Sequence, residues 1–253
     1  MNILAVNDDG IRSPGLFKLV EALSKVADVY VFAPHTQRSA SSHSISVTAP
    51  ITVNEVKFNN AKMAFESSGT PADCVKLGLN LLAGRGVEID MVFSGINHGG
   101  NLGTDTLYSG TVSAAAEGCF CKKPSVAVSV DSHNPNHFEP ACELALKVCQ
   151  NAFGKFAYGT VLNINTPDLP MGEIKGVKYV KLGPREYSER FEQRDGEDVA
   201  KYWYGGEPKF YENPEEYTDV IAMQEGFAVI TPLSYDLTDY KTLEEIGNWR
   251  IEE

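Results

Sequence analysis

The chain has 253 residues, of which 43% are hydrophobic, so it is long and apolar enough to bury a substantial core. Its formal net charge of -12 argues against binding to a nucleic-acid duplex or an anionic membrane surface, because both attract proteins with a basic face. No apolar run approaches the ~20 residues of a membrane span and no secretory signal pattern opens the chain, so we expect a cytoplasmic protein.

The first predicted β-loop-α unit ends its strand in two carboxylates. Residues 3–6 form an apolar run that predicts a strand, and the apolar spacing of residues 16–23, after Pro14, predicts a helix. Asp8 and Asp9 directly follow the strand, and ligands of open parallel sheets bind at the carboxyl ends of the strands. The pair indicates a metal site. The alternative is a turn that only caps the helix.

A hydroxyl-rich loop, residues 35–46, follows the second predicted strand, residues 28–33. It contains Ser39. A serine-rich stretch can be plain surface, but its place after a strand of a parallel sheet favours a functional role. Residues 51–58 then predict a half-exposed strand, and residues 70–84 predict a helix.

A glycine-rich loop at residues 94–103 is expected after a short buried strand at residues 89–93. Glycines let the backbone approach a ligand closely, and the amides of Asn97 and Asn101 offer an oxygen to a hard cation or a donor to a phosphate. The loop has neither the GxGxxG spacing nor a closing Gly-Lys-Ser or Gly-Lys-Thr, which disfavours dinucleotide and ATP sites of those types.

Ser109, Gly110 and Thr111 precede an alanine-rich helix start at residues 112–117. Backbone N–H groups and hydroxyls at a helix N-terminus form a ready anion site, so a phosphate could bind there. The alternative is that Ser109 and Thr111 only cap the helix. The functional interpretation gains weight because several strand-end loops carry polar residues of this kind.

The regular alternation of strands and helices ends near residue 170. Further elements are predicted at residues 124–130 (strand), 139–153 (helix), 160–164 (strand), 177–182 (strand), 219–222 (helical turn), 227–231 (strand) and 240–249 (helix). The aromatic and charged stretch 185–217 lacks periodicity and predicts hairpins or an extended arm. Its aromatic residues are expected to pack on a neighbouring subunit or, alternatively, on the chain's own sheet.

The cysteines lie scattered in apolar stretches, with no CxxC pair and no metal-ligand spacing shared with the five histidines. This distribution predicts reduced, buried thiols. The residues concerned are Cys74, Cys119, Cys121, Cys142 and Cys149.

Taken in order, the motifs resemble the survival protein E (SurE) family of metal-dependent nucleotidases over nearly the whole chain. The matching blocks are Asn7-Asp8-Asp9-Gly10, Ala33-Pro34 with Arg38-Ser39, Gly69-Thr70-Pro71-Ala72-Asp73, Ser94-Gly95-Ile96-Asn97, Ser109-Gly110-Thr111-Val112, Asn163-Ile164-Asn165, Thr218-Asp219 and Thr231-Pro232-Leu233. One departure is His35, which stands where the family pattern has Asp, and we expect it to affect hydrogen bonding near Arg38.

The resemblance implies a phosphomonoesterase that acts on nucleoside monophosphates with one divalent cation per subunit. The implied cation ligands are Asp8, Asp9, Ser39 and Asn97. Carboxylate, hydroxyl and amide oxygens form an all-oxygen set, which favours Mg²⁺ or Mn²⁺ over zinc.

Our hypothesis for the chemistry makes Asp8, Asp9 and Asn97 the catalytic residues. Asp8 or Asp9 would accept the proton of the attacking water. The phosphoryl oxygens would be held by Asn97, Ser109, Gly110 and Thr111. An aspartyl-phosphate route is disfavoured, because the Asp-x-Asp arrangement is missing after the first strand. A Ser39 nucleophile stays open and would need His43 as its base.

The fold implied is a three-layer, Rossmann-like α/β core with a mostly parallel sheet and a C-terminal β-rich arm. Residues 1–170 would form the core, and residues 171–253 the arm and closing helix within the same domain. Residues 185–235 are expected to exchange between subunits of a homodimer or tetramer. The expected substrates are nucleoside 5'-monophosphates and also 3'-monophosphates. The alternatives are a broad acid phosphatase or exopolyphosphatase, and a non-catalytic nucleotide-binding sensor.

Overall fold

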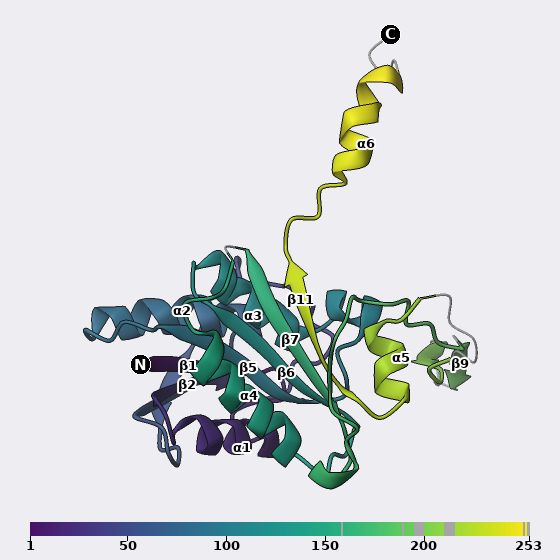
Figure 1. Ribbon diagram of the computed structural model, residues 1–253. Coiled ribbons are helices and arrows are strands. Elements are labelled where there is room, and N and C mark those ends of the chain that lie inside the picture. The colour runs from purple at the N-terminus through teal and green to yellow at the C-terminus, as the bar shows by residue number, and fades with distance from the viewer. Residues whose placement is uncertain (158, 189, 195–199, 210–215, 250, 252–253) are drawn as a thin grey trace.

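One sheet of nine strands lies at the centre of the computed structural model (Figure 1), which describes residues 1–157, 159–188, 190–194, 200–209, 216–249 and 251. In spatial order the strands are β3 (Val53–Val56), β4 (Met63–Ser67), β2 (Asp28–Pro34), β1 (Asn2–Val6), β5 (Met91–His98), β6 (Ser125–Asp131), β7 (Thr160–Pro167), β11 (Ala228–Ser234) and β8 (Val177–Tyr179). Neighbours are parallel except in the pairs β3–β4 and β7–β11. The mostly parallel α/β sheet is as predicted.

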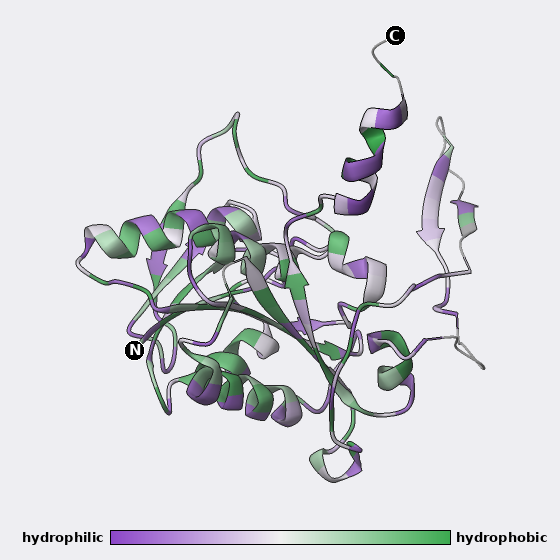
Figure 2. Ribbon diagram, turned by 45° about the horizontal axis from the view of Figure 1, so that its top comes forward, coloured by the Kyte–Doolittle hydropathy of each residue, from purple (hydrophilic) through white to green (hydrophobic). Residues whose placement is uncertain are grey.

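Helices cover both faces of this sheet. The helices α1 (Pro14–Leu23) and α4 (Glu139–Ala152) pack on one face, and α2 (Pro71–Gly84) and α3 (Gly110–Phe120) on the other (Figure 1). In β1, Ile3 and Ala5 join the first apolar cluster, whereas Leu4 and Val6 join the second. Because both faces of the central strands are buried, their sequences are continuous apolar runs. In Figure 2 hydrophobic residues, drawn in green, occur in the central strands and on the helices that cover them.

Three strands differ from the sequence-based expectation. β4 at residues 63–67 was not predicted, and the strand expected at 51–58 is the shorter β3, which pairs with it. β5 continues to His98 through the segment expected to be a loop from residue 94. Gly95 has a φ of +141°, and a Cβ there would lie 2.3 Å from the carbonyl oxygen of Val128. This glycine therefore permits a close strand contact beside the register shift of β5 against β6.

The chain beyond residue 170 contributes to the main sheet as well as to the arm. β11 pairs antiparallel with β7 and parallel with β8 inside one chain. The helix α5 (Asp219–Gln224) precedes β11, and short 3₁₀ turns lie at Met171–Glu173 and Gly103–Leu107. The segment 228–234 of the range expected to exchange is thus a strand of its own subunit's core.

Two appendages extend from the core. β9 (Arg190–Arg194) and β10 (Lys201–Gly205) form a separate antiparallel hairpin, and α6 (Tyr240–Glu245), followed by the 3₁₀ turn Ile246–Trp249, stands away from the body (Figure 1). Phe191 and Tyr204 face each other in the hairpin and are 68% and 61% exposed, so they do not cover the chain's own sheet. Residues 189, 195–199 and 210–215 of the predicted arm lie outside the described residues.

The described ranges contain no helix that is both long and apolar enough to cross a membrane. All five cysteines are free, as expected. Three are buried, and Cys121 and Cys142 are half-buried.

Candidate functional site

Asp8 is a buried carboxylate at the carboxyl end of β1. The Thr111 hydroxyl donates a hydrogen bond to its Oδ1, and the Arg38 N–H donates to its backbone carbonyl at 2.7 Å. The residue is only 4% exposed. Burial, opposed by the Thr111 hydrogen bond and reinforced by the charge of Asp9, raises the pKa of Asp8 to about 6. Asp8 thus lies directly against the start of α3.

Asp9 is partly buried and faces β5. Its Oδ2 accepts the backbone N–H of His98 at 3.2 Å, and its Oδ1 accepts the Gln37 amide at 3.2 Å. Burial raises the pKa of Asp9 above its ordinary value. Two adjacent carboxylates that are both costly to ionise form a site in which a divalent cation would be favourable.

Asn97 lies on β5, next to the residue that binds Asp9. Its amide nitrogen donates to the carbonyl of Gly99 at 2.8 Å. The amide oxygen accepts no hydrogen bond from the described residues, so it is available to a cation. Asn97 is therefore one residue along β5 from the backbone N–H that binds Asp9.

Ser39 lies in an exposed turn, and no hydrogen bond joins it to Asp8 or Asp9 within the described ranges. Its neighbour Arg38 contacts the Asp8 carbonyl, so the turn is held near the carboxylates. A residue that the sequence did not single out, Ser41, comes closer. Its Oγ is buried without a partner in the described structure, and a Cβ added at Gly110 would lie 2.9 Å from both Ser41 Oγ and Asp8 Oδ2.

The start of α3 meets the carboxylates. Ser109 is the N-cap, and its hydroxyl accepts the N–H of Val112 at 3.0 Å, so it caps the helix, whereas Thr111 does not. The Thr111 hydroxyl donates to Asp8 and so positions the carboxylate. Gly110 has no side chain, which lets Asp8 approach the first turn. The positive end of the α3 dipole is thus next to Asp8.

His43 contacts Glu117 and not Ser39, so its position does not support a role as the base of a Ser39 nucleophile. Its Nε2 lies 2.9 Å from Oε2 of Glu117, whose Oε1 accepts Lys76 Nζ at 2.9 Å. Burial alone would raise the pKa of Glu117, but the hydrogen bonds from His43 and Lys76 outweigh it and lower that pKa below its ordinary value. The His43 ring also stacks on Phe120, 5.1 Å between centroids. This arrangement fastens the serine-rich loop to α2 and α3.

A cluster of buried amides supports the glycine-rich segment from behind. The Asn101 N–H donates to Oδ1 of Asn165 at 2.7 Å, and the Asn101 carbonyl accepts the amides of Asn163 and Asn165 at 2.8 and 3.1 Å. The sequence contained a signal for this cluster, namely two asparagines on one buried strand, but only the fold shows their partner.

His35, the departure from the family pattern, contacts β4 and not Arg38. Its backbone N–H and Nδ1 both lie within 3 Å of the Ser67 carbonyl. Arg38 donates through Nη2 to the Ser68 carbonyl at 2.9 Å, while its buried Nε has no partner in the described part of the chain.

The donor set fits a hard cation and not a zinc site. Among the described residues no group of three or more His, Cys, Asp or Glu could hold a metal. Asp8 and Asp9 supply carboxylate oxygens, and Asn97 supplies a free amide oxygen. Any cation here would therefore take oxygen ligands from these residues and water, which is the coordination typical of Mg²⁺ or Mn²⁺.

These features define a doubly wound α/β protein with an acidic, oxygen-donor site at the carboxyl edge of its sheet, facing a helix N-terminus. Residues 3–189 match the family model described as Survival protein SurE. The chain belongs to the SurE family, which confirms the resemblance seen in the motifs.

Relatives match over nearly the full length. The 5'-nucleotidase SurE of Petrotoga mobilis is 42% identical over 252 residues, covering 98% of this chain and 99% of that protein. The 5'-nucleotidase SurE of Syntrophomonas wolfei is 44% identical over 248 residues, which cover 97% of this chain and 93% of that protein. The crystal structure of the SurE protein from Aquifex aeolicus is similar with a TM-score of 0.85 at 37% identity, and the match covers 98% of this chain and 99% of that one.

Proposed function

We propose that the protein is a 5'-nucleotidase, a hydrolase that releases phosphate from nucleoside 5'-monophosphates and also from 3'-monophosphates. The observation that carries this proposal is the contact between Asp8 and the first turn of α3 through Thr111. It joins a carboxylate that can bind a cation to a helix end that can bind an anion. The names and near-complete coverage of the relatives support the same activity.

Each residue has a distinct task in the proposed reaction. Asp8, Asp9, Ser39 and Asn97 would hold one Mg²⁺ or Mn²⁺. When bound, that cation supplies charge neutralisation at the phosphoryl group and a lower pKa for water. Asp8 or Asp9 accepts the proton of the attacking water at a carboxylate oxygen. Thr111 holds Asp8 in place, while Asn97, Ser109 and Gly110 orient the phosphoryl oxygens at the positive end of α3.

A sensor that binds nucleotides without hydrolysing them would not need two adjacent carboxylates, one buried and one partly buried, whose ionisation costs free energy. The acidic pair therefore favours an enzyme. A broader phosphatase or exopolyphosphatase would use the same residues, so the substrate range has to be measured.

Phosphate release should be measured from a panel of 5'- and 3'-nucleoside monophosphates and short polyphosphate, with Mg²⁺ or Mn²⁺ and with excess EDTA. We expect metal-dependent release, greatest from 5'-monophosphates, and none in EDTA. Equal rates on polyphosphate would favour the broader phosphatase. Binding of nucleotides without release under either metal would replace the nucleotidase by a sensor.

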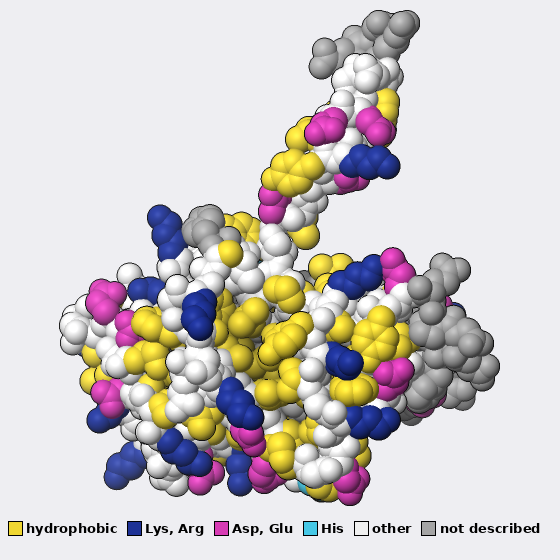
Figure 3. Space-filling model, in the orientation of Figure 1, with side chains coloured by type: hydrophobic (Ala, Val, Ile, Leu, Met, Phe, Trp, Pro, Cys, Tyr) yellow, Lys and Arg dark blue, Asp and Glu magenta, His cyan; other side chains and the backbone are white. Residues whose placement is uncertain are grey.

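We propose that the protein self-associates as a homodimer or tetramer through its C-terminal appendages. Apolar side chains lie along the exposed α6 segment and gather over the middle of the visible face of the body (Figure 3). Leu243 and Trp249 are both more than half exposed. An apolar cavity of about 760 Å³, lined by residues of α3 and β11 that include Phe120, Pro232 and Leu233, offers a second copy a surface for α6.

Replacing Leu243 and Trp249 together by Gln should weaken this association. Each large apolar side chain contributes about 1.5–3 kcal/mol when buried, so the dissociation constant should rise at least about 100-fold. Sedimentation at micromolar concentration measures this constant, with Glu244→Gln and Glu245→Gln together as the control on the same appendage. A stable monomer of the unsubstituted protein would contradict the proposed assembly.

A further inference from the structure

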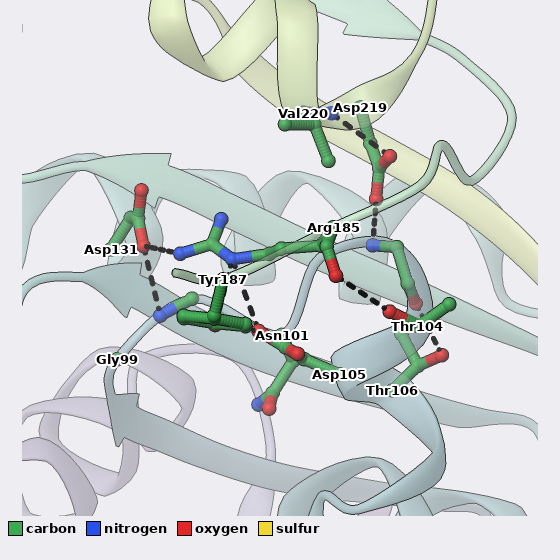
Figure 4. Close-up of polar contacts among 12 residues, drawn as sticks. Gly99, Asn101, Thr104, Asp105, Thr106, Asp131, Arg185, Tyr187, Asp219 and Val220 are labelled. Atoms are coloured by element: carbon green, nitrogen blue, oxygen red, sulfur yellow. Dashed lines mark hydrogen bonds and ion pairs between the residues drawn. The ribbon is translucent and has the colours of Figure 1, made fainter. Parts of the chain in front are cut away.

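The segment that leads into the hairpin is fastened to the glycine-rich segment by one arginine. Figure 4 shows Arg185 extended between two carboxylates. Its Nη2 lies 3.3 Å from Oδ1 of Asp131, at the end of β6, and its Nε lies 3.0 Å from Oδ2 of Asp105, in the 3₁₀ turn before α3. The Arg185 side chain is 13% exposed. The ion pairs are thus largely shielded from water.

Tyr187 completes this cluster. Its hydroxyl donates to Oδ2 of Asp105 and accepts a hydrogen bond from Arg185 Nε at 3.1 Å. The guanidinium also lies 6.0 Å from the centroid of the Tyr187 ring. Opposing charges and a phenol therefore hold Arg185 in one position.

Backbone contacts join the same two segments. Asp219, fully buried at the start of α5, accepts the N–H of Gly103 at 2.8 Å and that of Gly183 at 2.7 Å. The Thr104 hydroxyl donates to the carbonyl of Arg185 at 3.0 Å. A Cβ at Gly103 would lie 2.3 Å from the Gly183 carbonyl oxygen, so the backbones of these two segments are in direct contact.

The cluster holds the segment that connects two parts of the proposed site. Residues 100–107 connect Asn97, the proposed cation ligand, to Ser109 at the start of α3. Asp131 holds one end of this connection, because it also accepts the Gly100 N–H at 3.2 Å, and Asp105 lies near the other end. Arg185 bridges both. The two segments that lead into and out of the hairpin first meet at the next residue, where the Lys209 N–H donates to the Glu186 carbonyl at 2.9 Å.

We propose that Arg185 is a positioning residue for the phosphoryl site. By neutralising Asp105 and Asp131 together, it sets the spacing between Asn97 and the N-terminus of α3. Without the guanidinium the two carboxylates lose their shared partner, and the connection between them can open. This inference rests on the proposed function, because it concerns the same site, and it ties the geometry of that site to the base of the hairpin.

Arg185→Gln tests the proposal. With saturating Mg²⁺, we expect KM for a nucleoside monophosphate to rise about tenfold or more, with kcat changed less than about threefold. Calorimetry with inorganic phosphate should give an affinity weakened by a similar factor. If the substitution only unfolded part of the protein sample, the fraction of active enzyme would fall. The apparent kcat would then decrease while KM stayed unchanged.

Two further sets of variants make the test specific. Arg185→Gln combined with Asp105→Asn and Asp131→Asn removes the unpaired carboxylates and should restore part of the phosphate affinity. Lys181→Gln, on the same segment, breaks an exposed ion pair with Glu216 and should leave KM and phosphate affinity unchanged.

The outcomes separate the inference from the proposed function. Unchanged KM and phosphate affinity in Arg185→Gln would overturn the positioning role. If the unsubstituted protein hydrolyses no nucleotide but binds phosphate, and Arg185→Gln weakens that binding, only the proposed function fails. If the unsubstituted protein neither hydrolyses a nucleotide nor binds phosphate, both are wrong.

Discussion

Asp8→Asn is expected to abolish phosphate release while the fold is retained. Asparagine has the size of aspartate, keeps an oxygen for the Thr111 hydroxyl, and leaves the backbone contact with Arg38 in place. It removes the negative charge that would hold the cation and accept the proton. A loss of several kcal/mol of transition-state stabilisation corresponds to a decrease in kcat of about 10³-fold or more, at 1.36 kcal/mol per factor of ten.

The same substitution is expected to stabilise the metal-free protein above pH 6. Burial is the main reason that the pKa of Asp8 rises from 3.8 to about 6 in the folded state. The folded state then binds this proton more tightly than the unfolded chain does. The resulting stabilisation is complete below about pH 4 and is lost as the pH rises through about 6. Its size is on the order of 3 kcal/mol.

Thermal unfolding in EDTA between pH 4 and pH 8 measures this effect. The stability of the unsubstituted protein should decline over that interval by more than the stability of Asp8→Asn, and Mg²⁺ should stabilise only the former. Asp28→Asn, at an exposed carboxylate on β2, is the control and should behave like the unsubstituted protein. Turnover of Asp8→Asn comparable to that of the unsubstituted protein at saturating metal would remove Asp8 from the mechanism.

Gly15→Ala is expected to destabilise the fold by at least about 2 kcal/mol, although alanine is the better helix former. Gly15 is the second residue of α1, and a Cβ there would lie 2.0 Å from the carbonyl oxygen of Ile96. A backbone carbonyl in a central strand cannot rotate aside as a side chain can. Because Asn97 is the next residue of β5, metal-dependent activity should fall as well.

Gly84→Ala is the matched control for this prediction. Gly84 ends α2, and no atom lies within 4 Å of the Cβ that alanine would add. Its effect should range from neutral to a stabilisation of up to ~1 kcal/mol. Urea unfolding with an unchanged m value separates the two variants. If Gly15→Ala and Gly84→Ala unfolded at the same urea concentration, the predicted clash would be wrong, because α1 could move away from β5.

The sequence predicted the features that depend on local patterns. Apolar runs located β1 and β2, helix-opening signals located α1 and α2, and the ordered motifs indicated the SurE family. Asp8 and Asp9 could be selected because they directly follow a strand, where a parallel sheet places its ligands. For these residues, position along the chain is nearly equivalent to position in space.

The remaining features depend on contacts between distant segments. Gly95 looked like a loop residue, because only its partner Val128 shows that it lies within a strand. Ser41 could not be distinguished from the neighbouring serines without Gly110 opposite it. Arg185 stood in an aperiodic stretch, and its two carboxylate partners lie 54 and more residues away in the chain. Local pattern carries no information about such pairs.

The antiparallel direction of β11 determines where the chain leaves the sheet. Ser234, the last residue of β11, lies opposite Thr160, the first residue of β7, and so at the edge away from the carboxylates. The base of the hairpin, beside Asp131, lies at the carboxylate edge. The two appendages therefore depart from opposite ends of the sheet. A change at the base of the hairpin therefore lies close to the carboxylates of the same chain, whereas α6 follows the end of β11 that is remote from them.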